Sequence, residues 1–381
     1  MKVAILESIL MPAGHEIEFD RILTEEINGL GHEACFFVPE KFKLKFEYNV
    51  PIEYLEGGEA ISYAGIGPIK KIWLSMQREA RRKKWFDSAF KKAQQGLCDA
   101  IIIPTSTYRY IRALLKSDLK NSPVPVIFIL HGINPGEKDK FINAAEKCRE
   151  FKNIHFVVLT LRDDFSKTSL PNLHLLLPPA YTPRDLHVKP QFAVHEPLRL
   201  GFFGQYRREK NLEFFLQAFK EAKFQIPVRL IIQGATAKPE DGADFDRLAD
   251  AYKDLKNVTF WHKSLIGAEW QKALLDVDVI LMPYAAERYR YHWGGMLFTA
   301  IGYYKPVLQS PELNPEVLQN YDIGEAVQLD SVETFSRQLE NFVNSFPVKA
   351  KDYQEGLHKA NEAFSPTRFV NELIKISEQK K

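Results

Sequence analysis

The chain has 381 residues, of which 45% are hydrophobic and 26% charged, and its formal net charge is +2. That length suits two domains with sizeable cores, and the small net charge argues against a protein that binds nucleic acid through bulk charge. The longest apolar run, residues 124–130 with Pro125 inside it, is far shorter than the roughly 18 residues of a membrane span.

The N-terminal residues MKVAILES enter a strand pattern at once. This leaves no room for a secretory leader and predicts a cytoplasmic protein. The three cysteines lie far apart without the spacing of a metal site, and Cys35 and Cys98 fall in or beside apolar strand patterns. We therefore expect buried thiols in a reducing compartment.

The first half of the chain alternates short apolar runs with helical patterns. Each run is unbroken and aliphatic or β-branched, as in parallel strands that are covered on both faces. Strands are predicted at residues 3–6, 34–38, 100–103, 126–130, 156–159 and 173–177. A first helix, with apolar residues at helical spacing from Ile17 to Ile27, is expected to end near Gly29 and Gly31.

Pro178-Pro179 and the polar residues 182–197 interrupt this pattern and predict a domain linker. The second half then repeats the alternation, with helices expected at residues 212–222 and 245–255. Its strands are predicted at residues 198–203, 228–232, 258–261, 277–282, 307–309 and 326–329. The last helical pattern, residues 366–377, is amphipathic.

This alternation predicts an α/β protein with two Rossmann-like domains that face a cleft. We expect the first domain at residues 1–180 and the second at residues 195–362. Residues 363–381 are expected to form a C-terminal helix that can pack back across the interface.

The most informative stretch is residues 283–307, PYAAERYRYHWGGMLFTAIGYYKPV. Gly294 and Gly295 precede a short apolar helix, and bare amides at a helix start favour a phosphate or carboxylate. Donors and flat ring faces surround this point, supplied by Tyr284, Arg288, Tyr289, Arg290, Tyr291, His292 and Trp293. Such aromatic side chains bury either a ligand or each other, and both alternatives remain open from the residues alone.

Three other loops follow predicted strands. Gly14 lies in the first, where its backbone can approach a ligand, although an ordinary turn explains it as well. His131 and Gly132 follow the strand VIFIL, so the imidazole can act as a donor or a base, or be purely structural. The third loop, GFFGQYRREKN, ends at Asn211, a suitable N-cap for the next helix.

That third loop predicts a phosphate site. Lys210 places a cation at a helix start, where it opposes the positive end of the helix dipole. This placement is reasonable when an anion binds between the lysine and the helix. Arg207 and Arg208 offer planar, bidentate contacts to a diphosphate, whereas the alternative is a solvated basic turn.

Residues 69–85, IKKIWLSMQREARRKKW, form a basic amphipathic helical pattern. Ile69, Ile72, Trp73, Met76 and Ala80 share one face. The pattern suits contact with an anionic membrane surface, and it also suits a solvated helix that covers the first sheet.

Taken in order, these segments resemble the retaining glycosyltransferases of the GT-B architecture, of the glycosyltransferase group 1 type. The resemblance rests on GHE, CDAIIIP and PVIFILHG in the first half. In the second half it rests on LGFFGQYRREKNLEFFLQAF, RLIIQG, VTFWHKSL, DVDVILMPY and GYYKPVL.

The resemblance implies a nucleotide-sugar donor bound by the second domain and a glycan or lipid-linked acceptor against the first. It implies no essential metal or other cofactor. From the small net charge we expect no nucleic-acid partner, and from residues 69–85 a cytoplasmic protein that can sit at the inner face of the membrane. His131 and Lys210 match the catalytic histidine and the phosphate-binding lysine. Donor contacts are implied at Gly14, Gly204, Arg207, Arg208, Lys210, Gly234, Tyr284, Tyr291, His292, Gly294, Gly295 and Thr299.

The chain departs from the family pattern at three positions. Gln205 stands where an arginine is usual, and Tyr291 and Thr299 stand where the family has two glutamates. A non-catalytic binding module of the same architecture is therefore the main alternative to an active transferase. A nucleotide-sugar epimerase is a weaker one, because its acidic catalytic residues are not visible.

Overall fold

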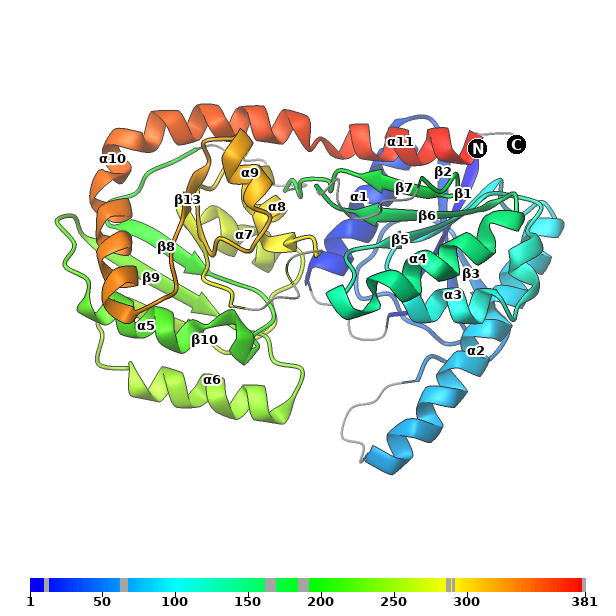
Figure 1. The fold of residues 1–381 in the computed structure, drawn as a ribbon, viewed down its shortest axis with the longest axis horizontal. Helices are drawn as coiled ribbons and strands as arrows, with labels where there is room; N and C mark the ends of the chain where they lie inside the picture. The colour runs from blue at the N-terminus through cyan, green and yellow to red at the C-terminus, as the bar shows by residue number, and fades with distance from the viewer. Residues whose placement is uncertain are drawn as a thin grey trace. The chain divides into compact units, whose positions relative to one another are not determined.

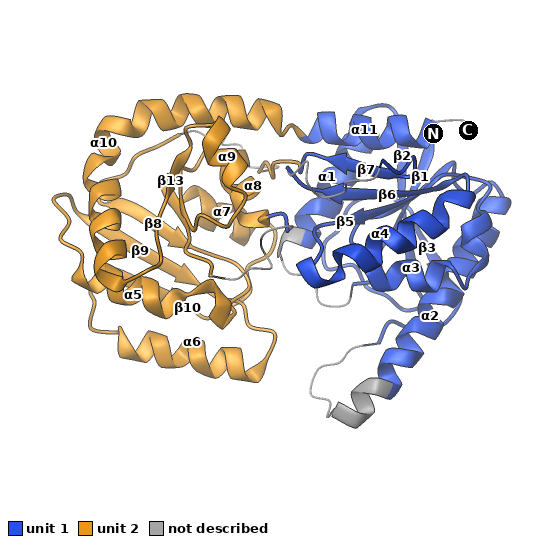
Figure 2. Ribbon diagram, in the orientation of Figure 1, with its two compact units in different colours: residues 1–178, 291–293, 366–381 blue, residues 179–290, 294–365 orange. Residues whose placement is uncertain are grey.

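A computed structural model describes residues 1–9, 14–61, 68–161, 169–183, 192–285, 289 and 292–378. The chain divides into two compact units, coloured separately in Figure 2. Unit 1 comprises residues Met1–Pro178, Tyr291–Trp293 and Pro366–Lys381, and unit 2 comprises Pro179–Arg290 and Gly294–Ser365.

Unit 1 is built on a seven-stranded parallel sheet with the strand order β3-β2-β1-β4-β5-β6-β7. Six of its strands lie where the apolar runs predicted them, and β3, a short strand at the sheet edge, was missed. The strands are β1 (Lys2–Leu6), β2 (Glu33–Pro39), β3 (Ile52–Leu55), β4 (Ala100–Ile103), β5 (Val126–Leu130), β6 (Ile154–Leu159) and β7 (Leu173–Leu176).

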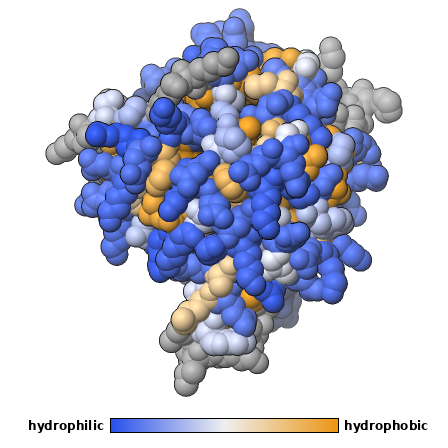
Figure 3. Space-filling view, turned by 90° about the vertical axis from the view of Figure 1, so that its right-hand side faces the viewer, coloured by the Kyte–Doolittle hydropathy of each residue, from blue (hydrophilic) through white to orange (hydrophobic). Residues whose placement is uncertain are grey.

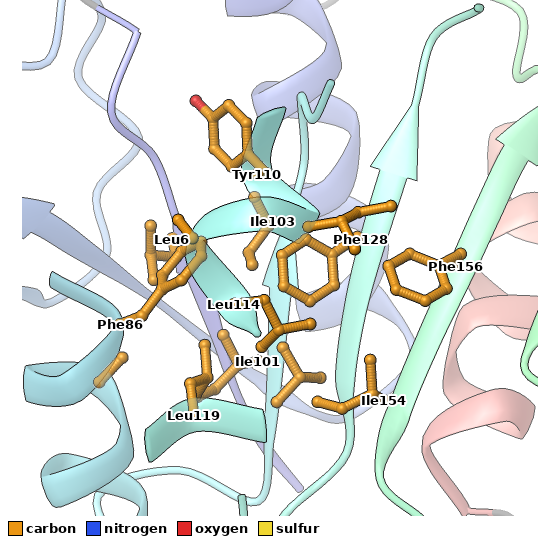
Figure 4. Close-up of a cluster of buried hydrophobic side chains, with 14 of the residues drawn as sticks. Leu6, Phe86, Ile101, Ile103, Tyr110, Leu114, Leu119, Phe128, Ile154 and Phe156 are labelled. Carbon is orange, nitrogen blue, oxygen red and sulfur yellow. The ribbon is translucent and has the colours of Figure 1, made fainter. Parts of the chain in front are cut away.

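Helices cover both faces of this sheet (Figure 1). They are α1 (Gly14–Gly29), α2 (Pro68–Gln94), α3 (Tyr108–Leu114), α4 (Lys138–Lys147) and α11 (Pro366–Glu378). Figure 4 shows the buried cluster under α2, α3 and α4, where Phe86 and Leu114 meet Phe128 and Phe156 from the sheet. On the other face α1 packs against α11, and Phe19 contacts Phe369 with 5.8 Å between ring centroids.

Unit 2 has a six-stranded parallel sheet with the order β10-β9-β8-β11-β12-β13. The strands are β8 (Leu198–Phe202), β9 (Val228–Gln233), β10 (Val258–Trp261), β11 (Val279–Met282), β12 (Val307–Gln309) and β13 (Gly324–Ala326). The helices are α5 (Leu212–Glu221), α6 (Pro239–Ala251), α7 (Ala268–Leu275), α8 (Gly295–Gly302), α9 (Pro315–Asn320) and α10 (Val332–Ala363). The prediction of two Rossmann-like α/β sheets is therefore confirmed.

Both sheets contain a switch point, where strand order reverses on either side of a central pair. In unit 1 the pair is β1 and β4, and in unit 2 it is β8 and β11. Ligands of open α/β sheets bind outside the carboxyl ends of the strands at such points. The loops that follow these four strands are consequently the first places to look for sites.

Helix length and cysteine burial concern the chain as a whole. None of the helices in the described residues is long and apolar enough to cross a membrane. All three cysteines are buried free thiols, as expected, and burial raises the pKa of Cys35 to about 11 and those of Cys98 and Cys148 to about 12.

Candidate functional site

The loops after β8 and β11 bring Gly204, Lys210 and Tyr284 together in unit 2. Lys210 ends a short 3-10 turn, Arg208–Lys210, and only 8% of its side chain is exposed. Its Nζ lies 3.4 Å from the carbonyl oxygen of Phe203 and 4.9 Å from the centroid of the Tyr284 ring. The ammonium is thus held in place by a cation–π contact with Tyr284 beside the Phe203 carbonyl.

Gly204 keeps the space beside this ammonium open. Its φ of +103° belongs to the left-handed region that favours glycine, and a Cβ added here would lie 3.4 Å from Lys210 Nζ. The Gly204 N–H donates to Gln233 Oε1 at 2.9 Å, and its carbonyl accepts the Ala235 N–H at 3.2 Å. Gln233, at the end of β9, thus positions the loop, and no local sequence signal identified it.

The two arginines of this loop contact their neighbours. Arg207 donates to Gln205 Oε1 at 2.9 Å, and Arg208 Nε lies 3.6 Å from Asp244. Asp244 also accepts the Tyr206 hydroxyl at 2.6 Å. Each guanidinium has five N–H donors, so donors remain on both side chains beyond these contacts, and a diphosphate contact from Arg207 or Arg208 stays a prediction.

Asn211 does not act as the N-cap that the sequence predicted. Asn211 precedes α5, but its side chain makes no capping hydrogen bond, and its φ of 59° places it in the left-handed region. Asparagine is one of the residues that adopt this conformation most readily. The residue therefore shapes the turn that presents Lys210 and does not cap the helix.

Residues 283–307 are divided between the two units, since Tyr291–Trp293 belong to unit 1. Tyr284, Tyr289 and Trp293 are buried, and the rings of the two tyrosines lie 5.2 Å apart. These aromatics are covered by the protein itself, which favours the alternative in which they bury each other. Arg288, Arg290 and Tyr291 lie outside the described residues.

The glycine pair at the start of α8 is only partly open. Gly294 donates its N–H to Asn314 Oδ1 at 3.0 Å, so the expectation of two bare amides was wrong at this residue. The N–H groups of Gly295 and Met296, in the first turn, have no hydrogen-bond partner within the described part of the chain. Thr299 is buried and donates its hydroxyl to Gly295 O at 2.8 Å, so its proton is engaged inside the helix.

Gly234 and Gly14 are the two other glycines predicted to contact the donor. A Cβ on Gly234 would lie 2.5 Å from the Phe245 ring, so close packing accounts for this glycine. Gly14 begins α1, and residues 10–13 before it lie outside the described residues.

His131 and His292 come together in unit 1, after β5. His131 Nε2 donates to Pro104 O at 2.9 Å, because a carbonyl can only accept, and its ring lies 4.9 Å from the Trp293 ring. The backbone N–H of Trp293 donates to His131 O at 3.0 Å. Gly132 pairs with His292 in an isolated antiparallel bridge, and its φ of +151° and the 2.6 Å from an added Cβ to His292 Cα require glycine.

Within the described residues, no three His, Cys, Asp or Glu side chains are grouped so that they could hold a metal ion. The expectation that no metal is needed stays a prediction. The geometry nevertheless offers one buried cation, Lys210, at the switch point of unit 2 and beside an open glycine.

A comparison with protein-family models decides what kind of domain carries this lysine. Residues 197–345 match the model of the glycosyl transferases group 1. Most of unit 2 is thus similar to this family. No curated protein matches the sequence.

Solved structures give the fold of the whole chain, which is GT-B. HepE from Anabaena, in complex with UDP and glucose, has a TM-score of 0.68 and 13% identity over 98% of both chains. A glycosyltransferase from Rickettsia africae has a TM-score of 0.67 and 11% identity over 99% of this chain and 97% of its own. WaaG, a glycosyltransferase involved in lipopolysaccharide biosynthesis, has a TM-score of 0.61 and 13% identity over 99% of this chain and all of its own.

Proposed function

We propose that the protein transfers a sugar from a nucleotide-sugar donor to an acceptor hydroxyl, with retention of the anomeric configuration. The buried Lys210 beside Gly204, at the β8–β11 switch point of a domain similar to the group 1 glycosyltransferases, carries the proposal. The structures of HepE with UDP and with UDP-glucose support a donor of the same class.

In the proposed reaction the bond between the sugar and the diphosphate breaks, and negative charge develops on the leaving diphosphate. The Lys210 ammonium, held over Tyr284, is placed to stabilise that charge. A fixed cation in a partly dry site interacts with the developing charge more strongly than one in water. The acceptor hydroxyl then attacks from the face of the leaving group, whose oxygen takes its proton. The catalytic role of His131 stays a prediction.

We further propose that the acceptor is a glycan or glycolipid precursor met at the inner membrane surface. Figure 1 shows α2 extending beyond the other helices of unit 1, and Figure 3 shows hydrophobic residues scattered among hydrophilic ones on the face that it presents. Trp73 is 57% and Met76 69% exposed, and both share a helix face with the exposed Ala80 and Lys84. From Trp85 onward α2 buries Trp85, Phe86, Ala89 and Ala93 in the core cluster of the sheet, and nearer its start Leu74 is buried while Trp73 and Met76 are not.

An exposed tryptophan and methionine beside basic residues fit the interface of an anionic bilayer. Vesicles of phosphatidylglycerol and phosphatidylcholine should sediment the wild-type protein, and the double variant Trp73→Ala and Met76→Ala should bind them several-fold more weakly. Tyr54→Ala is the matched control, because Tyr54 is also an exposed aromatic of unit 1 but lies on β3. Equal sedimentation of all three proteins would remove the membrane contact from the proposal.

Donor use is tested by a hydrolysis and transfer screen against a panel of nucleotide sugars, with glycan and glycolipid acceptors. We expect one donor to turn over, with loss of turnover in Lys210→Ala. Binding of a nucleotide without turnover on any acceptor would favour the non-catalytic binding module. Failure to bind or turn over any nucleotide sugar would reject the proposed function.

A further inference from the structure

A second site lies in unit 1, at the carboxyl ends of β1 and β4. A cavity of about 450 Å³ opens there, and the guanidinium groups of Arg78, Arg82, Arg109 and Arg112 line it from α2 and α3. Its lining includes one carboxylate, Glu79. Because β1 and β4 form the switch point of this sheet, the cavity occupies the place where open α/β sheets bind ligands.

Arg82 is the most informative member of this cavity. Only 8% of it is exposed, and its guanidinium stacks over the Tyr110 ring with 4.0 Å to the centroid. Its buried Nε has no hydrogen-bond partner, and the side chain forms no ion pair within 4 Å, among the residues that the structure describes. The charge of Glu79 acts on Arg82, and the unpartnered Nε leaves a buried donor for the oxygens of an anionic ligand.

The neighbouring groups hold Arg82 in this position and complete the cavity. Tyr110 is anchored by a hydrogen bond of 3.2 Å between its hydroxyl and Ser8 Oγ, beyond the end of β1. In Figure 4 its hydroxyl points away from the buried cluster. Thr105 Oγ1, buried in the loop after β4, likewise has no hydrogen-bond partner within the described chain.

The one carboxylate does not neutralise the cavity. Glu79 Oε2 lies 3.2 Å from Arg112 Nη2, and Glu79 Oε1 accepts a bond of 2.7 Å from Lys116. Glu79 is therefore shared with Lys116, and among the described lining residues Arg82, Arg109 and Arg112 outnumber it. Planar guanidinium forks bind phosphate oxygens in bidentate fashion.

We propose that this four-arginine cavity binds a phosphate group, and that in the transfer reaction it holds the phosphate of a phosphorylated acceptor. Phosphate binding stands on the cavity alone, whereas its assignment to the acceptor rests on the proposed function. The phosphate can belong to a soluble sugar phosphate or to a lipid headgroup, and these two sources present the same oxygens to the arginines.

Inorganic phosphate is the first probe, titrated by calorimetry against sodium chloride of equal ionic strength. We expect saturable binding that weakens about tenfold or more in Arg82→Met and in Arg109→Ala, because each removes charge-assisted hydrogen bonds. Arg109 is exposed, so its variant keeps the fold even where Arg82→Met does not. Arg149→Ala removes an exposed arginine of unit 1 outside the cavity and should bind like the wild type.

Equal phosphate affinity in all four proteins, or no saturable binding to the wild type, would overturn the proposal. Vesicles with phosphatidic acid then separate the two sources. Tighter binding than to phosphatidylcholine vesicles, lost in Arg109→Ala, assigns the cavity to a lipid phosphate, and no preference assigns it to a soluble one. The nucleotide that binds the wild type, among UDP, GDP and ADP, should bind these variants equally. If none of the three nucleotides binds any of the proteins while phosphate binding is intact, only the acceptor assignment is overturned.

Discussion

Glu7 gives a quantitative prediction about pH and stability. It follows β1, only 5% of it is exposed, and its Oε1 accepts the N–H groups of Ser8 and Ile9. The buried carboxyl group of Asp20, in α1, interacts electrostatically with it. Burial raises the pKa of Glu7 from 4.5 to about 7, and burial followed by the charge of Glu7 raises the pKa of Asp20.

The direction in which pH changes the free energy of unfolding follows from proton binding in the folded and unfolded states. Between pH 4.5 and 7 the folded protein holds a proton on Glu7 that the unfolded chain has released, so the free energy of unfolding falls as pH rises through this window. Each pKa unit corresponds to about 1.4 kcal/mol, so the ionised Glu7 makes the folded state about 3 kcal/mol less stable above pH 7 than below pH 4.5.

The variant Glu7→Gln tests this value. Its amide keeps the oxygen that accepts from Ser8 and Ile9, and its NH₂ can donate to the Asp20 carboxylate. We expect Gln at this position to stabilise unit 1 by about 3 kcal/mol at pH 8 and to have little effect at pH 4.5. Urea titrations at several pH values, followed by tryptophan fluorescence, measure the difference. Glu33→Gln, an exposed acid on β2, is the control. Unchanged pH dependence, or a less stable protein at pH 8, would refute the reasoning.

Three more outcomes follow from buried groups. Burial lowers the pKa of Lys305 to about 8, so stability should rise between pH 8 and 10.5, and Lys305→Met should abolish that rise in a pH series of urea midpoints. Gly302→Ala should cost about 3 kcal/mol, because its Cβ would lie 1.7 Å from the carbonyl oxygen of Tyr181. Gly136→Ala, with no atom within 4 Å, should leave the melting temperature nearly unchanged. In the native protein at pH 8 a thiol reagent should not label Cys35, Cys98 or Cys148, whereas it should label all three after unfolding.

Much of the fold was readable because parallel strands covered on both faces are continuous apolar runs. The β5 run VIFIL is wholly buried and was predicted with the bounds observed. In contrast, β3 leaves Ile52 and Tyr54 exposed at the sheet edge, and a glutamate stands between them. This strand therefore lacks the continuous apolar run that marks the others. The basic amphipathic pattern of residues 69–85 is visible in the sequence, but only tertiary packing decides that Trp73 and Met76 are left uncovered.

From the sequence, site residues could be predicted only where they lie in a loop that directly follows a strand. Lys210 and Gly204 could be named because both follow β8 at the switch point. The partners that give each residue its role come from distant parts of the chain. Asn314 takes the Gly294 amide across 20 positions, and Gln233 holds Gly204 across 29. The four-arginine cavity was missed for the same reason, since the topology alone brings α2 and α3 together beside β1.

The central claim is that Lys210 holds the diphosphate of a nucleotide-sugar donor. Calorimetric titration of UDP, GDP and ADP into the wild type, Lys210→Met and Lys220→Met tests it directly. Lys220 is an exposed lysine at the end of α5, so its variant matches the change in charge. We predict that one nucleotide binds the wild type and Lys220→Met equally, and binds Lys210→Met about 10 to 100 times more weakly. Equal affinity for all three proteins, or no binding to any of them, would contradict the account.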